Sequence, residues 1–298
     1  MDIKRLQHFL ALVETRSYWR AARKCQVTPQ ALSKSIQRLE QSLGVKLFDR
    51  DTRSVEPTLF AQELLPFARN IDAESRGMLR TLDTLLDTGL NRLVVGTGAA
   101  AAVELMAATI LAVRRHYPGL VVELIEGTCE TLAPQLLRGQ LDVIVSVMTT
   151  DAVDKLIEWH VLSDEPYRVY ARSGHPLLAR GDISLPMLLD YPWIGGDDED
   201  LVTDQLKVVF GQQGLEAPRP AVITNSILSA ISFVLQGDAL VCLPEAIVRR
   251  ELRQGLLVPL EAGLPVLSRP TVAFFRRHST RSPECLQFLR ELQKRVRG

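Results

Sequence analysis

The stretch SYWRAARKCQVTPQALSKSIQRLEQSLGVKLFDR, residues 17–50, decides the fold of the first part of the chain. It contains two helical patterns separated by only a few residues. Ser17 is a good N-cap for the first helix, and Thr28 followed by Pro29 is a good start for the second, because hydroxyls suit N-caps and proline suits the first turn. Gly44 ends the second helix. Two short helices joined by a tight turn predict a helix-turn-helix.

The second helix of this stretch has an apolar face and a polar face. Its apolar residues recur at helical spacing, at Leu32, Ile36, Leu39 and Leu43. Its other face carries hydrogen-bonding side chains, namely Gln30, Ser33, Lys34, Gln37, Arg38 and Gln41. A solvated face of any amphipathic helix has this composition. The tight turn, the caps and the basic segment behind the helix favour instead a recognition helix that enters the major groove of double-stranded DNA.

The predicted DNA contacts fall into two groups by their chemistry. Amides and hydroxyls bond to base edges, which assigns base reading to Gln30, Ser33 and Gln37. Cationic side chains meet phosphates and fix position without reading sequence, and these are Lys34, Arg38, Arg50 and Arg53. Two short strands, predicted at 45–48 and 54–55, would hold the last two arginines at the tip of a hairpin. The helix starts complete the predicted DNA-binding set with Ser17, Thr28 and Pro29.

Composition and charge restrict the class of protein. A chain of 298 residues exceeds one typical domain and predicts two or three packed units. Residues 1–60 carry 11 Lys/Arg and 6 Asp/Glu, a net charge of +5, whereas residues 91–298 carry 21 and 24, a net charge of −3. This asymmetry is typical of a polyanion-binding unit attached to a solubilising body. Neither a signal peptide nor a run of about eighteen apolar residues is present, which predicts a soluble, cytoplasmic protein with no membrane partner.

The first sixty residues resemble the winged helix-turn-helix of LysR-type transcriptional regulators. The matching residues, in the family's order and spacing, are Phe9, Ser17, Ala21, Ala22, Val27, Ala31, Leu32, Ser33, Ile36, Leu39, Glu40, Leu43, Gly44, Leu47, Phe48, Arg50 and Thr58. Pro29 and Gln30 stand where the family has Gln followed by Pro or Ser, so which side chain reaches a base stays open. Cys25 and Ala61 replace a common Leu and Gly. The resemblance implies a sequence-specific regulator of transcription, with RNA polymerase as a further candidate partner.

A long helical pattern follows Thr58. Its apolar stripe consists of Phe60, Leu64, Phe67, Ala68, Ile71, Leu79, Leu82, Leu85 and Leu86. A continuous helix of about 30 residues would be roughly 45 Å long, although Pro66 would bend it or mark its real start. The stripe could pack on its own domain. The resemblance implies instead a linker helix that pairs in a homodimer, with further contacts making a homotetramer.

Residues 91–298 alternate strand and helix patterns, which predicts α/β architecture with parallel sheets flanked by helices. Strands are expected at 93–97, 121–125, 143–147, 168–171, 221–224, 240–243 and 272–275, and helices at 103–116, 130–138, 201–213, 227–236, 245–253 and 283–296. Three stretches resemble the family's effector-binding domain: HYPGLVVELIEGTCETLAPQLLRGQLDVIV, VLSDEPYRVYARSGHPL and VLQGDALVCLP. The resemblance implies two lobes similar to periplasmic binding proteins. The predicted division is 1–58 for the winged helix-turn-helix, 59–88 for the linker helix, 91–162 with 270–298 for lobe I, and 163–269 for lobe II.

The resemblance also implies a small-molecule effector in a cleft between the lobes. The predicted lining consists of Gly98, Ala99, Ala100, Ala101, Thr128, Cys129, Ser146, Met148, Trp193, Ile194, Gly195, Asn225 and Ser226. None of these is Lys or Arg, although helix N-termini after Gly98 and Asn225 could hold a carboxylate. The apolar members of the lining predict an effector that is mostly apolar and carries at most one negative group.

Other functional classes find less support in the sequence. The five histidines are scattered, and GTGAAAA at 96–102 lacks the third glycine and the lysine of a phosphate loop. The cysteines Cys25, Cys129, Cys242 and Cys285 form no CxxC pair, which predicts reduced thiols. Cys129 could be a redox sensor or an ordinary pocket thiol, and the acidic run 197–200 a metal site or a solvated loop. A solute-binding protein would need an export signal. The sequence therefore predicts a regulator and not an enzyme, with no cofactor or metal.

Overall fold

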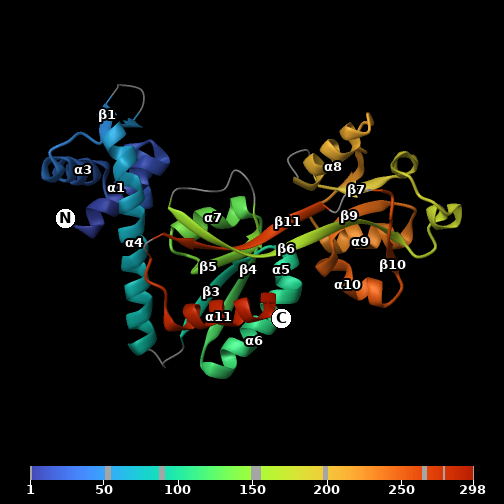
Figure 1. Cartoon of the computed structure of the whole chain (residues 1–298). Helices are drawn as coiled ribbons and strands as arrows, with labels where there is room; N and C mark the ends of the chain where they lie inside the picture. Colours follow the sequence, from blue (N-terminus) through green and yellow to red (C-terminus); the bar gives the residue numbers. More distant parts are fainter. Residues whose placement is uncertain are drawn as a thin grey trace.

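The structure is a computed structural model that describes residues 2–50, 55–86, 91–148, 156–196, 201–263, 267–277 and 279–297. Figure 1 shows a compact helical unit at the N-terminus, one long helix, and an elongated two-part α/β region. The N-terminal elements are α1 (Ile3–Thr15), α2 (Tyr18–Lys24), α3 (Pro29–Leu43), β1 (Phe48–Arg50), β2 (Val55–Pro57) and the long helix α4 (Leu59–Leu86).

The helix ends of the N-terminal unit follow the predicted caps. The Ser17 side chain accepts a hydrogen bond from the backbone N–H of Arg20, and the Thr28 side chain accepts one from Ala31. Gly44 ends α3 in the left-handed conformation, with φ 72°. The predicted strands shift along the chain, since β1 begins at Phe48 and β2 at Val55. The tip of this hairpin, 51–54, lies outside the described residues.

The core of the N-terminal unit lies between the four helices and the hairpin. Its fully buried residues include Leu6, Phe9, Leu12, Ala21, Ala22, Leu32, Ile36, Leu39, Leu47, Ala61 and Ala68. Burying a large apolar side chain contributes roughly 1.5–3 kcal/mol. Leu43 is 38% exposed, so its predicted place in the buried stripe is wrong; it lies in the last turn of α3. Pro66 lies inside α4 and does not start it. The first half of α4 therefore belongs to this core.

Over its described residues, the C-terminal region folds into one nine-stranded sheet flanked by helices. The strands are β3 (Arg92–Thr97), β4 (Val121–Glu126), β5 (Val143–Val147), β6 (Ile157–Arg172), β7 (Trp193–Gly195), β8 (Pro220–Ile223), β9 (Leu240–Pro244), β10 (Leu257–Pro259) and β11 (Leu267–Arg276). The helices are α5 (Ala99–Ala101), the π-helix η1 (Ala102–Met106), α6 (Ala107–His116), α7 (Cys129–Leu137), the 3-10 helices η2 (Pro176–Arg180) and η3 (Leu185–Asp190), α8 (Leu201–Gln212), α9 (Ile227–Gln236), α10 (Glu245–Arg253) and α11 (Pro283–Arg297).

The sheet has the order β4-β3-β5-β11-β6-β9-β7-β8, with β10 paired to β6. We call the part built on β3, β4 and β5 lobe I, and the part built on β7, β8 and β9 lobe II. Within each lobe these strands pair in parallel, as predicted. The two strands that join the lobes, β6 and β11, are long and antiparallel (Figure 1). The prediction of parallel strands alone was wrong for this pair, whose register shifts between Thr271 and Val272.

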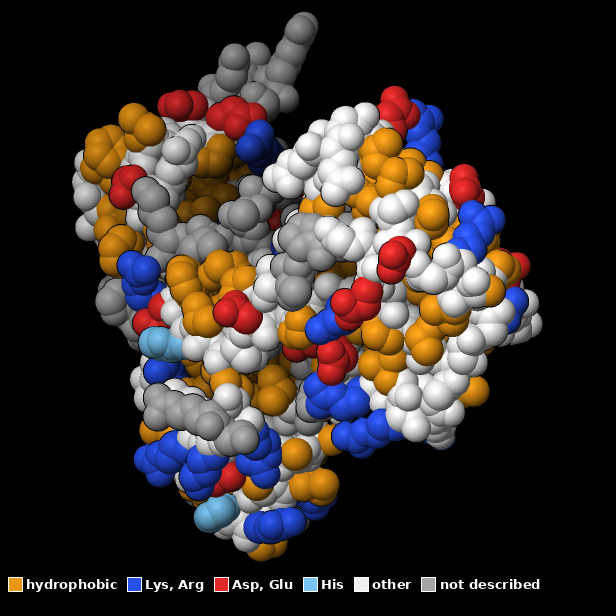
Figure 2. All heavy atoms as spheres, turned by 45° about the vertical axis from the view of Figure 1, so that its right-hand side comes forward, with side chains coloured by type: hydrophobic (Ala, Val, Ile, Leu, Met, Phe, Trp, Pro, Cys, Tyr) orange, Lys and Arg blue, Asp and Glu red, His pale blue; other side chains and the backbone are white. Residues whose placement is uncertain are grey.

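Helices cover both faces of the sheet in each lobe. In lobe I, α6 and α11 pack on one face and α7 on the other. In lobe II, η2, η3 and α8 pack on one face and α9 and α10 on the other. Cationic side chains end α6, where they compensate the helix dipole, and Lys, Arg and His side chains gather at this lower end of the molecule in Figure 2. Over the described residues, no helix is both long and apolar enough to cross a bilayer.

Candidate functional site

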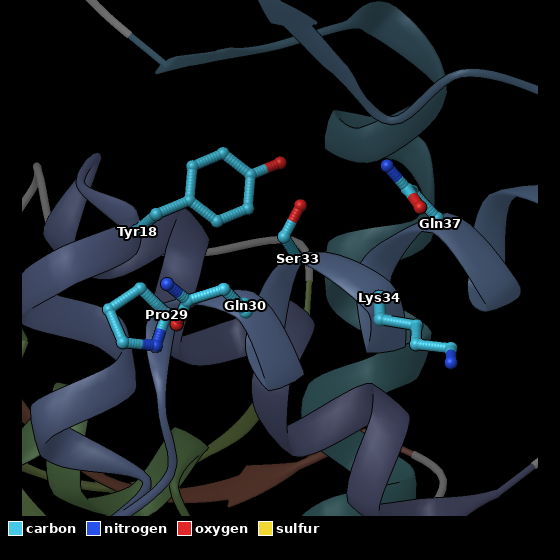
Figure 3. Close-up of a pocket in the computed structure, with 6 residues that line it drawn as sticks. All are labelled: Tyr18, Pro29, Gln30, Ser33, Lys34 and Gln37. Carbon is cyan, nitrogen blue, oxygen red and sulfur yellow. The ribbon is translucent and has the colours of Figure 1, made fainter.

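The polar face of α3 and the start of α2 form an open concavity on the N-terminal unit. Its lining consists of Tyr18, Pro29, Gln30, Ser33, Lys34 and Gln37. In Figure 3 the side chains of Tyr18, Ser33 and Gln37 extend toward the same space, whereas Lys34 points away from it. Five residues of the predicted DNA-binding set therefore lie together on one surface.

The geometry of α3 explains this grouping. Leu32, Ile36 and Leu39 anchor the opposite side of the helix in the core. Residues three or four apart lie above one another on a helix, so Gln30, Ser33 and Gln37 form one row. The concavity thus contains a row of two amides and a hydroxyl, which are groups that bond to base edges.

Tyr18 is the lining residue that the sequence interpretation missed. It is half-buried and packs against the N-terminal core from the first turn of α2. The sequence feature that could have indicated Tyr18 is its position directly after the cap Ser17, in the first turn of α2. The small Ala21 and Ala22 bring α2 close to the start of α3. A large side chain in the first turn of α2 therefore had to lie near the polar face of α3.

The other predicted DNA-binding residues lie around this surface. Arg38 is exposed on α3 outside the concavity. The hydroxyls of Ser17 and Thr28 accept backbone hydrogen bonds at the helix starts, which leaves each hydroxyl hydrogen available to a phosphate oxygen. The side chain of Arg50 and the whole of Arg53 lie outside what the structure describes.

Two polar contacts hold α3 in place behind this surface. The buried Glu40 carboxylate accepts from the backbone N–H groups of Leu47 at 2.9 Å and Phe48 at 3.4 Å, which ties α3 to β1. His8 Nδ1 lies 2.7 Å from the Ser35 hydroxyl and ties α3 to α1. Burial lowers the pKa of His8 below its ordinary value. Both contacts fix the direction of the polar row.

Two family models match this chain and cover most of it. Residues 3–62 match the bacterial regulatory helix-turn-helix protein of the lysR family, and residues 88–297 match the LysR substrate binding domain. The chain belongs to the LysR family. It is a sequence-specific DNA-binding regulator of transcription whose C-terminal domain binds a small-molecule effector.

Relatives of this LysR regulator are also regulators of transcription. It is 28% identical to the HTH-type transcriptional regulator GbpR of Azospirillum brasilense over 84% of this chain and 73% of that protein. It is 28% identical to the SDS degradation transcriptional activation protein of a Pseudomonas strain over 90% of this chain and 87% of that protein. A full-length OxyR variant from Pseudomonas aeruginosa has the same fold, with 22% identity, a TM-score of 0.62 and 98% of each chain covered.

The predicted effector residues of this LysR regulator form two groups, one in each lobe. Both groups lie at the carboxyl ends of parallel strands, where α/β sheets place their ligands. In lobe I they follow or end β3, β4 and β5, at Gly98, Ala99, Ala100, Thr128, Ser146 and Met148. In lobe II they belong to or follow β7 and β8, at Ile194, Gly195, Asn225 and Ser226.

Close packing links the members of the lobe I group. A Cβ on Gly98 would lie 2.5 Å from the Ser146 hydroxyl oxygen, so a larger residue would force this buried serine to move. Thr128 is the N-cap of α7 and makes no capping bond with its side chain. In lobe II the Ser226 side chain caps α9 by accepting from the Ser229 N–H at 3.3 Å. Each group therefore contains at least one hydroxyl at the start of a helix, Thr128 before α7 and Ser226 before α9.

Five predicted lining residues are buried in hydrophobic cores of the structure. Trp193 packs in the core of lobe II, edge-on to Phe210, and its indole N–H donates to the Leu188 carbonyl at 2.9 Å. Alternation along β7 turns Trp193 to one face of the sheet and Ile194 to the other. Cys129 and Ala101 are likewise buried in the two cores of lobe I. Ala100 and Ile194 are buried together in the core that contains α9 and α10. The apolar part of the predicted lining therefore loses its largest member.

A basic residue lies closer to this region than the sequence suggested. Arg269 of β11 donates to the backbone carbonyl of Met148 at 3.3 Å. Arg269 is far from the predicted lining segments in the sequence. Only the pairing of β11 with β5 brings it next to Met148. Within the described part of the chain no His, Cys, Asp and Glu cluster could hold a metal ion. The acidic run 197–200 lies outside that part.

Proposed function

We propose that this regulator reads its operator with Gln30, Ser33 and Gln37 and fixes its position on the duplex with Lys34, Arg38, Arg50 and Arg53. The observation that carries this proposal is the row of amide and hydroxyl side chains on the exposed face of α3. Base contacts from such groups discriminate between sequences, whereas cations on phosphates act on all sequences alike.

A DNA-binding assay tests this proposal, and its specific probe is a duplex that the protein selects from a random pool. Gln30→Ala should weaken binding to the selected duplex by about 1–3 kcal/mol and leave random DNA almost unaffected. Arg38→Ala should weaken both and reduce the slope of log affinity against log salt by roughly one. Equal losses on both duplexes for Gln30→Ala would contradict the proposed division of roles.

Self-association of the chain follows from the DNA-binding geometry. One recognition helix covers only a half-site, so two copies are needed for a full operator. An apolar stripe on α4 is exposed in the single chain, at Leu59, Phe60, Phe67, Ile71, Met78, Leu79 and Leu82. A second copy of α4 is the partner that this stripe fits, which supports the linker and homodimer roles assigned to residues 59–88. The register shift at Thr271 supports a lobe boundary near residues 163 and 270.

The effector is a small molecule with one negative group. Ser146, Thr128 and Ser226 supply neutral hydrogen bonds, and Arg269 supplies one cation near Met148. A single cation pairs better with a ligand that has one carboxylate than with a ligand that has two. Calorimetric titration with matched mono- and dicarboxylates measures this preference, and Arg269→Gln should weaken the monocarboxylates. Tighter binding of the dicarboxylates, with Arg269→Gln unaffected, would reject this assignment.

The protein acts by binding and not by turnover. Its relatives named above are regulators of transcription, and the effector groups contain hydroxyls and backbone N–H groups in place of a nucleophile with its base. A regulator of a bacterial chromosome works in the cytoplasm, beside the DNA. RNA polymerase remains the candidate partner on the promoter.

A further inference from the structure

The helix that follows β3 contains a π-helical segment in its interior. The elements α5, η1 and α6 follow one another without a break, because Ala102 and Ala107 at their junctions keep helical backbone angles, with φ −58° and −57°. In η1 the hydrogen bonds span five residues in place of four, which adds one residue to the turn. Residues 99–116 therefore form one continuous helix with one extra residue near its start.

The two parts of this helix pack in different lobes. Ala100 is 7% exposed and lies in the core of lobe II, and both α5 and η1 contact α10 where the lobes meet (Figure 1). Ala101 and Met106 are buried in the lobe I core together with α6. Just before the helix, the backbone N–H of Gly98 donates to the carbonyl of Val145 in β5 at 2.9 Å. The chain is therefore fixed to lobe I on both sides of a residue that packs in lobe II.

The π segment explains how one helix can pack in both lobes. Each residue of an α-helix turns by about 100°, so Ala101 and Met106, five positions apart, would point about 140° apart. A π turn brings residues five positions apart to nearly the same face. A regular α-helix would therefore point one of these two side chains away from the lobe I core. The extra residue keeps both in that core and leaves Ala100 against lobe II.

We propose that η1 is a hinge between the lobes, at which α5 stays attached to lobe II and α6 to lobe I while the lobes move. Helices bend at π segments because the regular hydrogen-bond ladder is interrupted there. The chain itself crosses between the lobes along β6 and β11, so η1 is a further attachment at a different place. The predicted effector residues then divide, since Gly98 moves with lobe I and Ala100 with lobe II. This hinge goes beyond the effector role proposed above and acts without a ligand.

Hydrogen exchange of the full, ligand-free chain measures the hinge directly. Residues 103–106 occupy the fifth to eighth positions of their helix, and residues 231–234 occupy the same positions of the regular helix α9. After correction for intrinsic rates, the amides of 103–106 should exchange roughly tenfold faster than those of 231–234, because hinge motion opens the π turn. Equal protection of the two segments would overturn the proposal.

Deletion of Val103 tests whether the extra residue keeps α5 on lobe II. Val103 is 60% exposed, so its loss removes little packing and makes the helix regular. The deletion turns α5 by about 100° relative to α6. Exchange should become faster in α10, residues 245–253, and stay unchanged in α6, residues 107–116. Val103→Ala keeps the residue count and should change neither. Faster exchange in α6, or unchanged exchange in α10, would show that η1 serves another purpose.

Ala100→Glu tests the same contact without changing the length of the helix. The carboxylate would enter the core of lobe II, so α10 should lose protection as it does in the deletion variant. Ala108→Glu places the same charge on an exposed position of α6 and is the control. An α10 that keeps its protection in Ala100→Glu would mean that α5 does not hold lobe II, and the hinge would be rejected.

Discussion

His8 connects two helices whose relative position decides where the DNA-contacting row points. Its Nδ1 atom lies 2.7 Å from the Ser35 hydroxyl, and partial burial is the main reason that its pKa is lowered. Asp2 opposes this shift and Lys4 adds to it. The neutral imidazole is thus the form that the fold prefers, since a protonated ring would be poorly solvated between α1 and α3.

The lowered pKa of His8 predicts a loss of stability in acid. The unfolded chain binds the His8 proton at a higher pH than the folded chain, so the free energy of unfolding falls as pH falls through about 6.5. His8→Gln removes this titration and retains a hydrogen-bonding partner for Ser35. Hydrogen exchange in α1 and α3, corrected for intrinsic rates, should show less loss of protection in acid for this variant. Equal losses in the two proteins would contradict the assignment.

Elements with strong local signals were predictable from the sequence. The caps Ser17 and Thr28 and the terminator Gly44 determine α2 and α3 through bonds that each segment makes by itself. The predicted bounds of α9 to α11 also agree with the structure within a residue. The apolar strands of the two lobes were found for a similar reason, because continuous apolar runs report burial on both faces of a sheet.

Elements that depend on distant partners were predicted only in part. The sequence indicated strands at 168–171 and 272–275, where apolar residues are frequent, but not the rest of β6 and β11. Most residues of β6 are exposed or half-buried, and the two strands owe their full length to pairing with each other over ten register positions. For the effector groups the missing information was the direction of single side chains. A strand of three residues such as β7 is too short to show an alternating pattern of apolar and polar residues. The local sequence therefore did not indicate that Trp193 and Ile194 pack on opposite faces of the sheet.

At the scale of the whole molecule, the large sheet of the C-terminal region is open at both ends. The edge strand β4 lies in lobe I and the edge strand β8 in lobe II. Each of these lobes also carries a helix with an exposed apolar residue, α6 with Leu111 in lobe I and α9 with Leu228 in lobe II. Open edges with apolar neighbours favour pairing with another chain. A second copy related by a two-fold axis, with lobe I against lobe II, would cover all four edges of the pair at once.

This arrangement predicts that charges at either edge reduce the size of the assembly. Leu111→Glu in lobe I and Leu228→Glu in lobe II should each lower the sedimenting mass by the same step, because each variant damages both contacts of a two-fold pair. Val208→Glu on α8 is the matched control, since Val208 is 60% exposed, as is Leu111, and α8 packs on the face of lobe II opposite to α9. Sedimentation velocity of the full chain gives the result. An unchanged mass for both edge variants, or the same decrease with Val208→Glu, would show that these edges do not hold the copies together.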